Sequence, residues 1–350
     1  MKTLVIVLSE TRAHELTFDN FKENVLDTLD ADLCICIGVK PDYDYTNPFY
    51  NHSKYKFLYN EPDDYGDAFE EAYEKLKPFN KESNPLHWRE FLKVKDQFLG
   101  GIKGENQHKG SAGILIFFRW FLLQQLTEQG LIHKYDRFII TRSDYIYQLP
   151  HPKLDLLEEK YIWIPDNEYY GGYTDRHAIL NKETIIPYLN ILNNFVLKSN
   201  DYYTKLKDHD EWNLEKIIKF NLEQEHQIVK VFPYVMYAVR NSDTGTRWAQ
   251  GNYSEELGYY IKYQSEFEAS TQYKKEYEES GLSIDEFYKK QFEIEGFQNR
   301  KGITPLITLL VLGIIVFLLI KNRTLSRWGI FICICICIFI ALLIQEYIYL

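Results

Sequence analysis

The segment Phe138–Tyr147 is FIITRSDYIY, in which a charged Arg-Ser-Asp triplet interrupts an apolar, strand-forming run. The residue types before the triplet favour β-structure, so residues 135–141 predict a central strand that ends at the triplet. In an α/β sheet, ligands bind beyond the carboxyl ends of the strands. We therefore expect Arg142 and Asp144 to meet a charged ligand. The alternative is that they form an ion pair that closes the end of the strand.

The N-terminal region predicts the start of the same sheet. Residues 3–8 (TLVIVL) are apolar throughout, as expected of a parallel strand that is buried on both faces. A helix capped by Thr17 is expected over 18–29, and a second strand over 33–39, which together make a β-α-β unit. Such a unit is the usual start of a nucleotide-binding α/β sheet. The chain lacks a G-x-G-x-x-G phrase, which disfavours the dinucleotide-binding form of that fold.

Helix and strand patterns continue along the first 250 residues, although residues 41–110 are polar and show little periodicity. The further strands that we expect are 54–59, 161–165, 178–180 and 227–237, and the further helices are 68–76, 112–128, 187–196 and 212–222. This alternation predicts a mixed α/β domain over residues 1–250. The charged segment that follows, residues 251–302, is expected to be a helical connector.

Two C-terminal runs are apolar and long enough to cross a bilayer, and they predict a multi-pass membrane protein. They are residues 303–320 (ITPLITLLVLGIIVFLLI) and 328–344 (WGIFICICICIFIALLI), separated by the basic segment 321–327. The basic segment by itself favours a cytoplasmic loop, with the large domain on the opposite side. However, the N-terminus MKTLVIVLSETR has the pattern of a strand and not of a signal peptide. The large domain would also be made before the first span, so we expect it to face the cytoplasm.

Composition excludes some classes of partner and of site. The 350 residues carry a net charge of -10, so a nucleic-acid backbone is not an expected partner. The 28 tyrosines suit a surface that binds sugars or nucleotides, although a general composition bias explains them equally well. The five cysteines have no C-x-x-C spacing, which predicts neither a zinc site nor a disulfide framework.

A carboxylate at the end of a strand is suited to metal binding. Mn²⁺ or Mg²⁺ can be held by one or two carboxylates, with water and phosphate oxygens completing the coordination shell. Asp144 is the candidate ligand, and Arg142 is placed to donate a charged hydrogen bond to phosphate. Bound in this way, the metal would neutralise a departing diphosphate.

Two further segments carry candidate site residues. In residues 169–177 (YYGGYTDRH), Gly171 and Gly172 allow close backbone approach to a ligand or a turn with positive φ, and Asp175 is a hydrogen-bond partner for sugar hydroxyls. An ordinary Gly-Gly turn explains the same pattern. In residues 207–212 (KDHDEW), Asp210 and Glu211 are candidates for a catalytic base at a helix start. Stabilisation of these carboxylates by the helix dipole is the alternative.

Three of these segments, taken in order, resemble a known group of enzymes. They are 9–38 (SETRAHELTFDNFKENVLDTLDADLCICIG), 134–147 (KYDRFIITRSDYIY) and 163–180 (WIPDNEYYGGYTDRHAIL). They resemble GT-A-type nucleotide-sugar glycosyltransferases of the kind found in large DNA viruses and in bacterial lipopolysaccharide or capsule synthesis. The resemblance implies a GT-A-like (Rossmann-like) mixed sheet flanked by helices. It also implies transfer of a hexosyl or pentosyl group from a nucleotide-sugar to a glycan or lipid-linked acceptor.

The resemblance also implies roles for single residues. Arg12 would lie near the nucleotide, Asp144 at a Mn²⁺ or Mg²⁺ ion, and Asp175 near the donor or acceptor sugar. The remaining donor-binding residues that it implies are Arg142, Gly171, Gly172 and Arg176. The sequence departs from the family pattern at one point, because Arg-Ser-Asp offers a single carboxylate where the family has two.

The expected function is therefore that of a membrane-anchored glycosyltransferase. One alternative is a non-catalytic membrane or virion protein built on an inactive transferase scaffold. A metal-dependent phosphodiesterase or nuclease is disfavoured, because it would need more clustered carboxylates and histidines than the segment FIITRSDYIY supplies.

Overall fold

The structure is a computed structural model that describes residues 1–95, 98–104, 108, 110–166, 169–241 and 251–301. The chain divides into two compact units, Met1–Ile284 and Asp285–Leu350. The two runs expected to span a membrane, residues 303–320 and 328–344, lie outside the described residues. Within the described residues, no helix is both long enough and apolar enough for a bilayer span.

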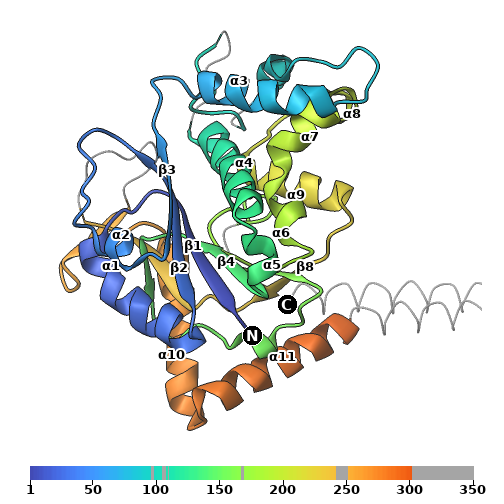
Figure 1. Cartoon of the computed structure of the whole chain (residues 1–350). Coiled ribbons are helices and arrows are strands. Elements are labelled where there is room, and N and C mark those ends of the chain that lie inside the picture. Colours follow the sequence, from blue (N-terminus) through green and yellow to red (C-terminus); the bar gives the residue numbers. More distant parts are fainter. Residues whose placement is uncertain (96–97, 105–107, 109, 167–168, 242–250, 302–350) are drawn as a thin grey trace, which may run out of the picture. The chain divides into compact units, whose positions relative to one another are not determined.

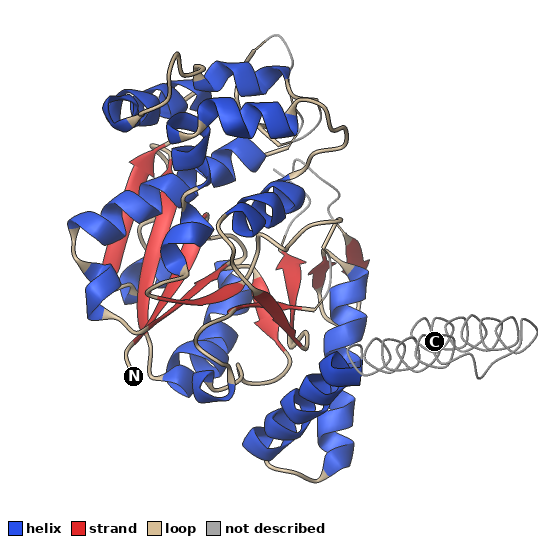
Figure 2. Ribbon diagram, turned by 90° about the vertical axis from the view of Figure 1, so that its right-hand side faces the viewer, coloured by secondary structure: helices blue, strands red, loops and turns tan. Residues whose placement is uncertain are grey.

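A seven-stranded mixed sheet forms the centre of the first unit (Figures 1 and 2). Its strands, in spatial order, are β3 (Tyr55–Asn60), β2 (Asp32–Val39), β1 (Thr3–Ser9), β4 (Arg137–Thr141), β7 (Ala178–Asn181), β6 (Ile162–Pro165) and β8 (Val229–Phe232). Strands β3, β2, β1 and β4 run parallel, and β7 is antiparallel to both of its neighbours, β4 and β6. The predicted α/β class, a mixed sheet flanked by helices, is confirmed.

Helices cover both faces of the sheet. The described helices of the first unit are α1 (His14–Phe21, continued as a π-helix over Lys22–Asp27), α2 (Pro48–His52), α3 (Tyr65–Leu76), α4 (Ala112–Glu128), α5 (Leu131–Lys134), α6 (Ile185–Leu189), α7 (Ile191–Leu197), α8 (Ser199–Leu206), α9 (Leu214–Gln224) and α10 (Gln264–Ser280). Helix α4 lies on one face and α1 and α2 lie on the other (Figure 1). Helix α11 (Ile284–Lys301) follows at the boundary with the second unit.

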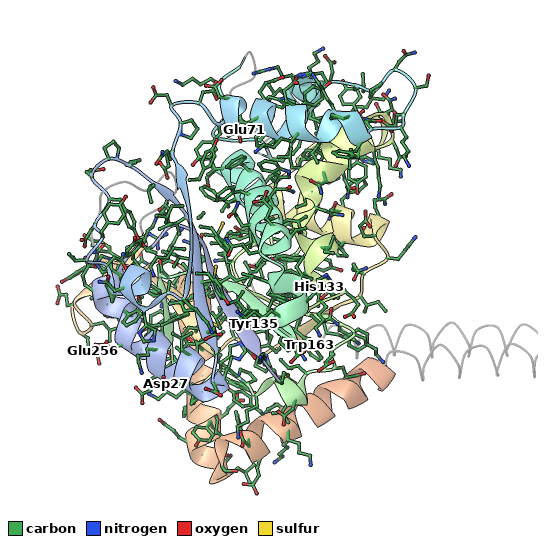
Figure 3. All side chains as sticks on the ribbon, in the orientation of Figure 1. Asp27, Glu71, His133, Tyr135, Trp163 and Glu256 are labelled. Carbon is green, nitrogen blue, oxygen red and sulfur yellow. The ribbon has the colours of Figure 1, made fainter. Side chains whose placement is uncertain are left out.

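Burial explains the strongest sequence patterns. Strand β1 alternates its side chains between two cores, and Leu4 and Ile6 pack in the same cluster as Phe117 and Phe118 of α4. Helix α4 is apolar on all sides because it is enclosed by the sheet and by α3, α6 and α7. Figure 3 shows side chains filling the layers between the strands and the helices. The bounds of α4 match the prediction.

The structure corrects three local predictions. Helix α1 begins at His14 and not after Thr17, because Ala13 adopts a left-handed conformation there. The Thr17 hydroxyl lies 3.0 Å from the Ala13 carbonyl oxygen, inside the helix, and so does not cap it. The helix expected over 187–196 is divided at Asn190 into α6 and α7.

A second, four-stranded sheet joins the first at the charged triplet. Its strands, in spatial order, are β10 (Asn252–Ser254), β11 (Tyr259–Ile261), β9 (Met236–Arg240) and β5 (Tyr145–Tyr147). The third correction lies here, because residues 252–261 form a hairpin that turns at Gly258, where φ is 77°. The helical structure expected from residue 251 begins only at α10. The hairpin pairs with β9, and the first compact unit continues to Ile284.

Candidate functional site

The triplet Arg142-Ser143-Asp144 is the point where the chain passes from the large sheet to the small one. It follows β4 and precedes β5, as its interruption of the apolar run suggested. The Ser143 hydroxyl lies 3.2 Å from the carbonyl oxygen of Glu10 and 3.0 Å from that of Arg12. Both of those residues follow β1. Ser143 therefore holds together the segments that leave the carboxyl ends of two adjacent parallel strands.

Both carboxylate oxygens of Asp144 accept hydrogen bonds from arginines. Arg142 donates from Nε to Oδ1 at 2.8 Å and from Nη2 to Oδ2 at 2.7 Å, and Arg240 at the end of β9 donates from Nη1 to Oδ2. The Asp144 side chain is only 2% exposed. Burial alone would raise the pKa of Asp144, but the two arginines outweigh it and hold this pKa well below its usual range. The ion pair offered as the alternative to a ligand contact is present.

Arg142, Arg240 and Lys262 all act on this carboxylate, and Arg12 lies within electrostatic reach of Lys262. We call these four residues the basic cluster. Burial lowers the pKa of the Lys262 ammonium to about 6, and repulsion from Arg142 and Arg240 acts in the same direction. The Arg142 side chain is 22% exposed, so solvent reaches the cluster. Glu10, which pairs with Arg12, adds a second carboxylate. With Lys262 protonated, the four positive charges of the basic cluster exceed the two negative charges of Asp144 and Glu10.

Arg240 keeps hydrogen-bonding capacity that the described residues leave unused. Its side chain is 4% exposed, and its Nη1 also donates to its neighbour's backbone, the Val239 carbonyl oxygen, at 2.7 Å. Its Nε and Nη2 have no hydrogen-bond partner among the described residues. Unpaired buried donors of this kind are uncommon, and in native proteins they accompany functional sites or bound molecules.

The donor set at Asp144 does not fit a divalent metal ion. Mn²⁺ and Mg²⁺ need oxygen atoms with available lone pairs, whereas three of the about four lone-pair positions of the Asp144 carboxylate accept from guanidinium groups. Two adjacent arginines would also repel a dication. In the part of the chain that the structure describes, no group of three His, Cys, Asp or Glu side chains is arranged to hold an ion.

The paired glycines pack against the first turn of α9. Gly171 has a φ of 81°, which glycine adopts without strain. A Cβ added to Gly172 would overlap the backbone carbonyl group of Glu215. The Tyr173 N–H donates to that same carbonyl oxygen at 3.0 Å. The predicted turn is confirmed, whereas the close approach that Gly172 makes is to the backbone of α9 and not to a ligand. Contact of Gly171 and Gly172 with a donor stays a prediction.

This packing sets Glu215 near Asp175. Helix α9 is capped by Asn213, whose side-chain oxygen accepts from the Lys216 N–H at 2.8 Å, so Glu215 lies in its first turn. Burial raises the pKa of Glu215 to about 7, and the neighbouring Asp175 carboxylate acts in the same direction. A buried carboxyl group beside a second carboxylate is a common arrangement for acid–base chemistry.

The raised pKa of Glu215 gives an expected effect on stability. Because the fold favours the neutral carboxyl, ionisation of Glu215 lowers stability as the pH rises from about 4.5 to about 7. We expect Glu215→Gln to raise the free energy of unfolding by on the order of 2 kcal/mol at pH 8 and to leave it unchanged at pH 4. Urea unfolding at both pH values measures this difference, with the exposed Glu223→Gln on the same helix as control. Equal shifts at the two pH values would contradict the assignment.

Asp210 and Glu211, the predicted catalytic bases, lie at the surface. Their side chains are 66% and 87% exposed. The Asp210 carboxylate is 3.0 Å from Lys95 Nζ, and that of Glu211 is 3.7 Å from Lys216 Nζ. The structure therefore places Glu215, and not these two residues, near Asp175. Sequence reasoning missed Glu215. The signal that could have identified it is an acidic residue two positions after an Asn that caps a helix.

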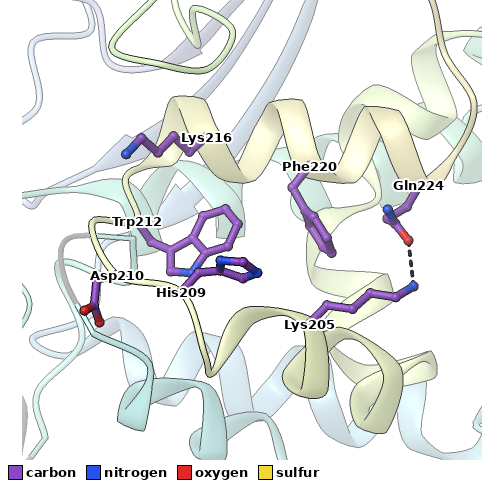
Figure 4. Close-up of a pocket in the computed structure, with 7 residues that line it drawn as sticks. All are labelled: Lys205, His209, Asp210, Trp212, Lys216, Phe220 and Gln224. Atoms are coloured by element: carbon purple, nitrogen blue, oxygen red, sulfur yellow. Dashed lines mark hydrogen bonds between the residues drawn. The ribbon is translucent and has the colours of Figure 1, made fainter.

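Asp210 also borders an open cavity of about 500 Å³ on α8 and α9 (Figure 4). The rings of Trp212 and Phe220, which line it, pack edge to face with their centres 5.9 Å apart, at 71°. Lys205 donates to the Gln224 side chain at 2.7 Å along the rim. Aromatic faces edged by polar groups suit the faces of a sugar ring. The full lining is Lys205, His209, Asp210, Trp212, Lys216, Phe220 and Gln224.

Arg176 is engaged inside the protein. Its guanidinium donates to the carboxylate of Glu266 in α10 and lies 4.4 Å from the centre of the Tyr263 ring. Glu266 also accepts from the Ala238 N–H and from the Tyr234 hydroxyl, each at 2.9 Å. Both side chains of the pair are almost completely buried. These contacts tie the segment before β7 to α10, and contact of Arg176 with a donor stays a prediction.

Comparison with known proteins finds similarity only at the level of solved structures. No family model matches the sequence, and no curated protein matches it. Among solved structures, the chain is similar to the apo form of mouse xyloside xylosyltransferase 1, with 10% identity and a TM-score of 0.33. The similarity covers 66% of this chain and 85% of that one. A likeness at this level carries no weight for the activity of this chain.

Proposed function

We propose that the protein is a glycosyltransferase that uses a nucleotide-sugar donor. The observation that carries the proposal is the basic cluster at the carboxyl ends of β1 and β4, the edge at which α/β sheets bind ligands. Cationic side chains match the charge of a nucleoside diphosphate. The sequence resemblance of residues 9–38, 134–147 and 163–180 supports the same function.

A second group of side chains completes the proposed site. Tyr263 lies within electrostatic reach of both Arg142 in the basic cluster and Asp175. Asp175 is in turn close enough to Glu215 to affect its pKa. Anion-binding residues and a carboxyl pair thus occupy one neighbourhood of the first unit. A glycosyl transfer needs both, because a diphosphate leaves while a hydroxyl attacks.

In the proposed glycosyl transfer, the basic cluster and the two carboxyl groups have different roles. The bond between the anomeric carbon and the diphosphate oxygen breaks, and the basic cluster stabilises the charge that develops on that oxygen. The acceptor hydroxyl oxygen forms the new bond to the anomeric carbon. Its proton passes to Asp175 or Glu215 as general base. The sugar is a hexosyl or pentosyl group, and the acceptor is a glycan or a lipid-linked glycan.

Membrane attachment belongs to the same proposal. Residues 303–320 and 328–344 would anchor the chain, and the first unit would face the cytoplasm. Anchoring would keep the transferase beside an acceptor carried on a lipid, and the aromatic cavity on α8 and α9 is the proposed contact for that glycan.

Substitution of Asp175 tests the proposed function. We expect Asp175→Asn to lower sugar transfer by about 10²- to 10⁴-fold, because the amide cannot accept the proton. The measurement is release of UDP, GDP or TDP from the matching nucleotide-sugars by the full chain in detergent. Asp27→Asn, in an exposed ion pair with Lys22, is the matched control and should leave transfer unchanged.

Three results would oppose the proposal. Equal rates for wild type and Asp175→Asn would exclude Asp175 from the chemistry. No nucleotide release from any donor, by a chain that unfolds cooperatively, would favour an inactive scaffold. Hydrolysis of a phosphodiester bond in place of sugar transfer would favour a phosphodiesterase or nuclease, the activity that the sequence disfavours.

A further inference from the structure

We propose that the basic cluster binds the diphosphate group directly, with Arg240 and Lys262 filling the place that a metal ion would take. The inference rests on the proposed function and specifies how the donor is held. It follows from three features of the site: the occupied carboxylate of Asp144, the unpaired donors of Arg240 and the position of Lys262.

The Asp144 carboxylate binds the two arginines in place of a metal ion. Its two oxygens fix the guanidinium groups of Arg142 and Arg240, which come from different sheets. A buried carboxylate that accepts three charged hydrogen bonds stays ionised and holds both partners in one geometry. Asp144 is therefore a positioning residue that orients two cations toward a shared ligand.

Arg240 supplies the donors. Its Nη1 is used by Asp144, whereas its Nε and Nη2 have no partner among the described residues. A buried guanidinium N–H without an acceptor costs free energy, because its interaction with water has been lost. A phosphate oxygen is a strong acceptor for two parallel N–H groups of a guanidinium. Binding of phosphate would remove this cost.

Lys262 adds a positive charge when it is protonated, and a bound anion favours that form because it attracts the ammonium. It follows β11, and its backbone N–H donates to the Ala238 carbonyl oxygen at 2.9 Å, which fixes it beside β9. Its ammonium lies 5.0 Å from the centre of the Tyr263 ring, near Arg142 and Arg240. A network with a purely structural role would balance its charges, whereas in this one the four basic side chains outnumber the two carboxylates. A polyanion is the ligand that such a cluster favours.

Titration calorimetry with and without a metal tests the inference. The full chain in detergent is titrated with inorganic pyrophosphate, UDP, GDP and TDP, in EDTA and again in MnCl₂. We expect pyrophosphate and one nucleoside diphosphate to bind in EDTA, and Mn²⁺ to change each Kd by less than about threefold. Lys262→Met should weaken binding by about tenfold or more, which is the loss of one charged hydrogen bond, and Lys262→Arg should retain it. The control is Lys275→Met on α10, whose ion pair with Glu279 is exposed.

The outcomes separate the inference from the proposed function. Binding of a nucleoside diphosphate only with Mn²⁺ would overturn the inference and leave the transferase proposal standing. Binding of pyrophosphate in EDTA, with no preference for any nucleotide, would support the inference and count against a nucleotide-sugar donor. Wild-type affinity in Lys262→Met would overturn the inference. No binding of any probe, by a chain with a cooperative unfolding transition, would overturn both.

Discussion

Replacing Arg176 with methionine is expected to lower the free energy of unfolding by about 3–5 kcal/mol at pH 8. The substitution would leave the Glu266 carboxylate buried without its cation, while the Ala238 N–H and the Tyr234 hydroxyl still donate to it. Two hydrogen bonds do not replace a salt bridge at a site with no access to water. The loss should therefore exceed that of any exposed ion pair in the chain.

The same substitution should act differently at lower pH. Burial raises the pKa of Glu266 even with Arg176 present, and removal of the cation raises it further. The folded variant then binds a proton that the unfolded chain releases, so stability falls as the pH rises. Urea unfolding at pH 5 and pH 8 measures this, and we expect the smaller loss at pH 5.

Two comparisons make this prediction sharp. Lys275→Met breaks a pair whose side chains are both 66% exposed, and it should cost less than about 1 kcal/mol. The double variant Arg176→Met, Glu266→Gln removes both charges, keeps an acceptor for the Ala238 N–H and the Tyr234 hydroxyl, and should recover most of the stability. A loss below about 1 kcal/mol for Arg176→Met at pH 8 would show that the pair is not the main link to α10.

The second large effect is expected for Gly172→Ala. The added methyl group would overlap the carbonyl group of Glu215, and a backbone neighbour cannot rotate away as a side chain can. We expect a loss of about 2–4 kcal/mol in the free energy of unfolding, toward the upper end of overpacking effects. Relaxation would also move the first turn of α9 and change the distance between Glu215 and Asp175. A displacement of about 1 Å is enough to lower transfer by about a hundredfold.

Gly130→Ala is the matched control for this experiment. Gly130 has a φ of 65° and no atom within 4 Å of an added Cβ, so only backbone strain opposes the change. It should cost about 1–2 kcal/mol and leave sugar transfer unaffected. Thermal unfolding and donor turnover of both variants provide the comparison. If Gly172→Ala loses no more than Gly130→Ala, the overlap at Glu215 is relieved without harm and the prediction fails.

The fold was predictable where one segment carries its own signal. Helix α4 is a long apolar run with a glycine beyond its end, and its bounds follow from that pattern alone. Strands β1 and β2 are short apolar runs that must be buried on both faces. The small sheet was not predictable in this way, because β5 pairs with β9 across a long separation in sequence. Three-residue strands such as β10 and β11 leave almost no periodic pattern.

Some residues of the candidate site were likewise predictable from the local sequence, and others were not. The position of Arg142 and Asp144 at a strand end follows from the local interruption of an apolar run. Their neighbours Arg240 and Lys262 lie far downstream in segments with no motif, and only the pairing of the small sheet brings them to Asp144. Glu215 was missed for a smaller reason. The expected helix began at residue 212, whereas the Asn213 cap starts α9 at Leu214.

The contacts of the triplet also bear on how the first unit loses its structure. Asp144 directly precedes β5 of the small sheet, and the Val239 N–H donates to its carbonyl oxygen at 2.8 Å, which extends the pairing of β5 with β9. The Asp144 carboxylate accepts from Arg142, which directly follows β4 of the large sheet, and the Ser143 hydroxyl donates to two carbonyl oxygens beyond β1. Detachment of the small sheet alone would draw Asp144 away from Arg142 and leave a buried carboxylate short of one of its cations, which makes partial opening costly. The two sheets therefore gain and lose their order together, as one cooperative folding unit.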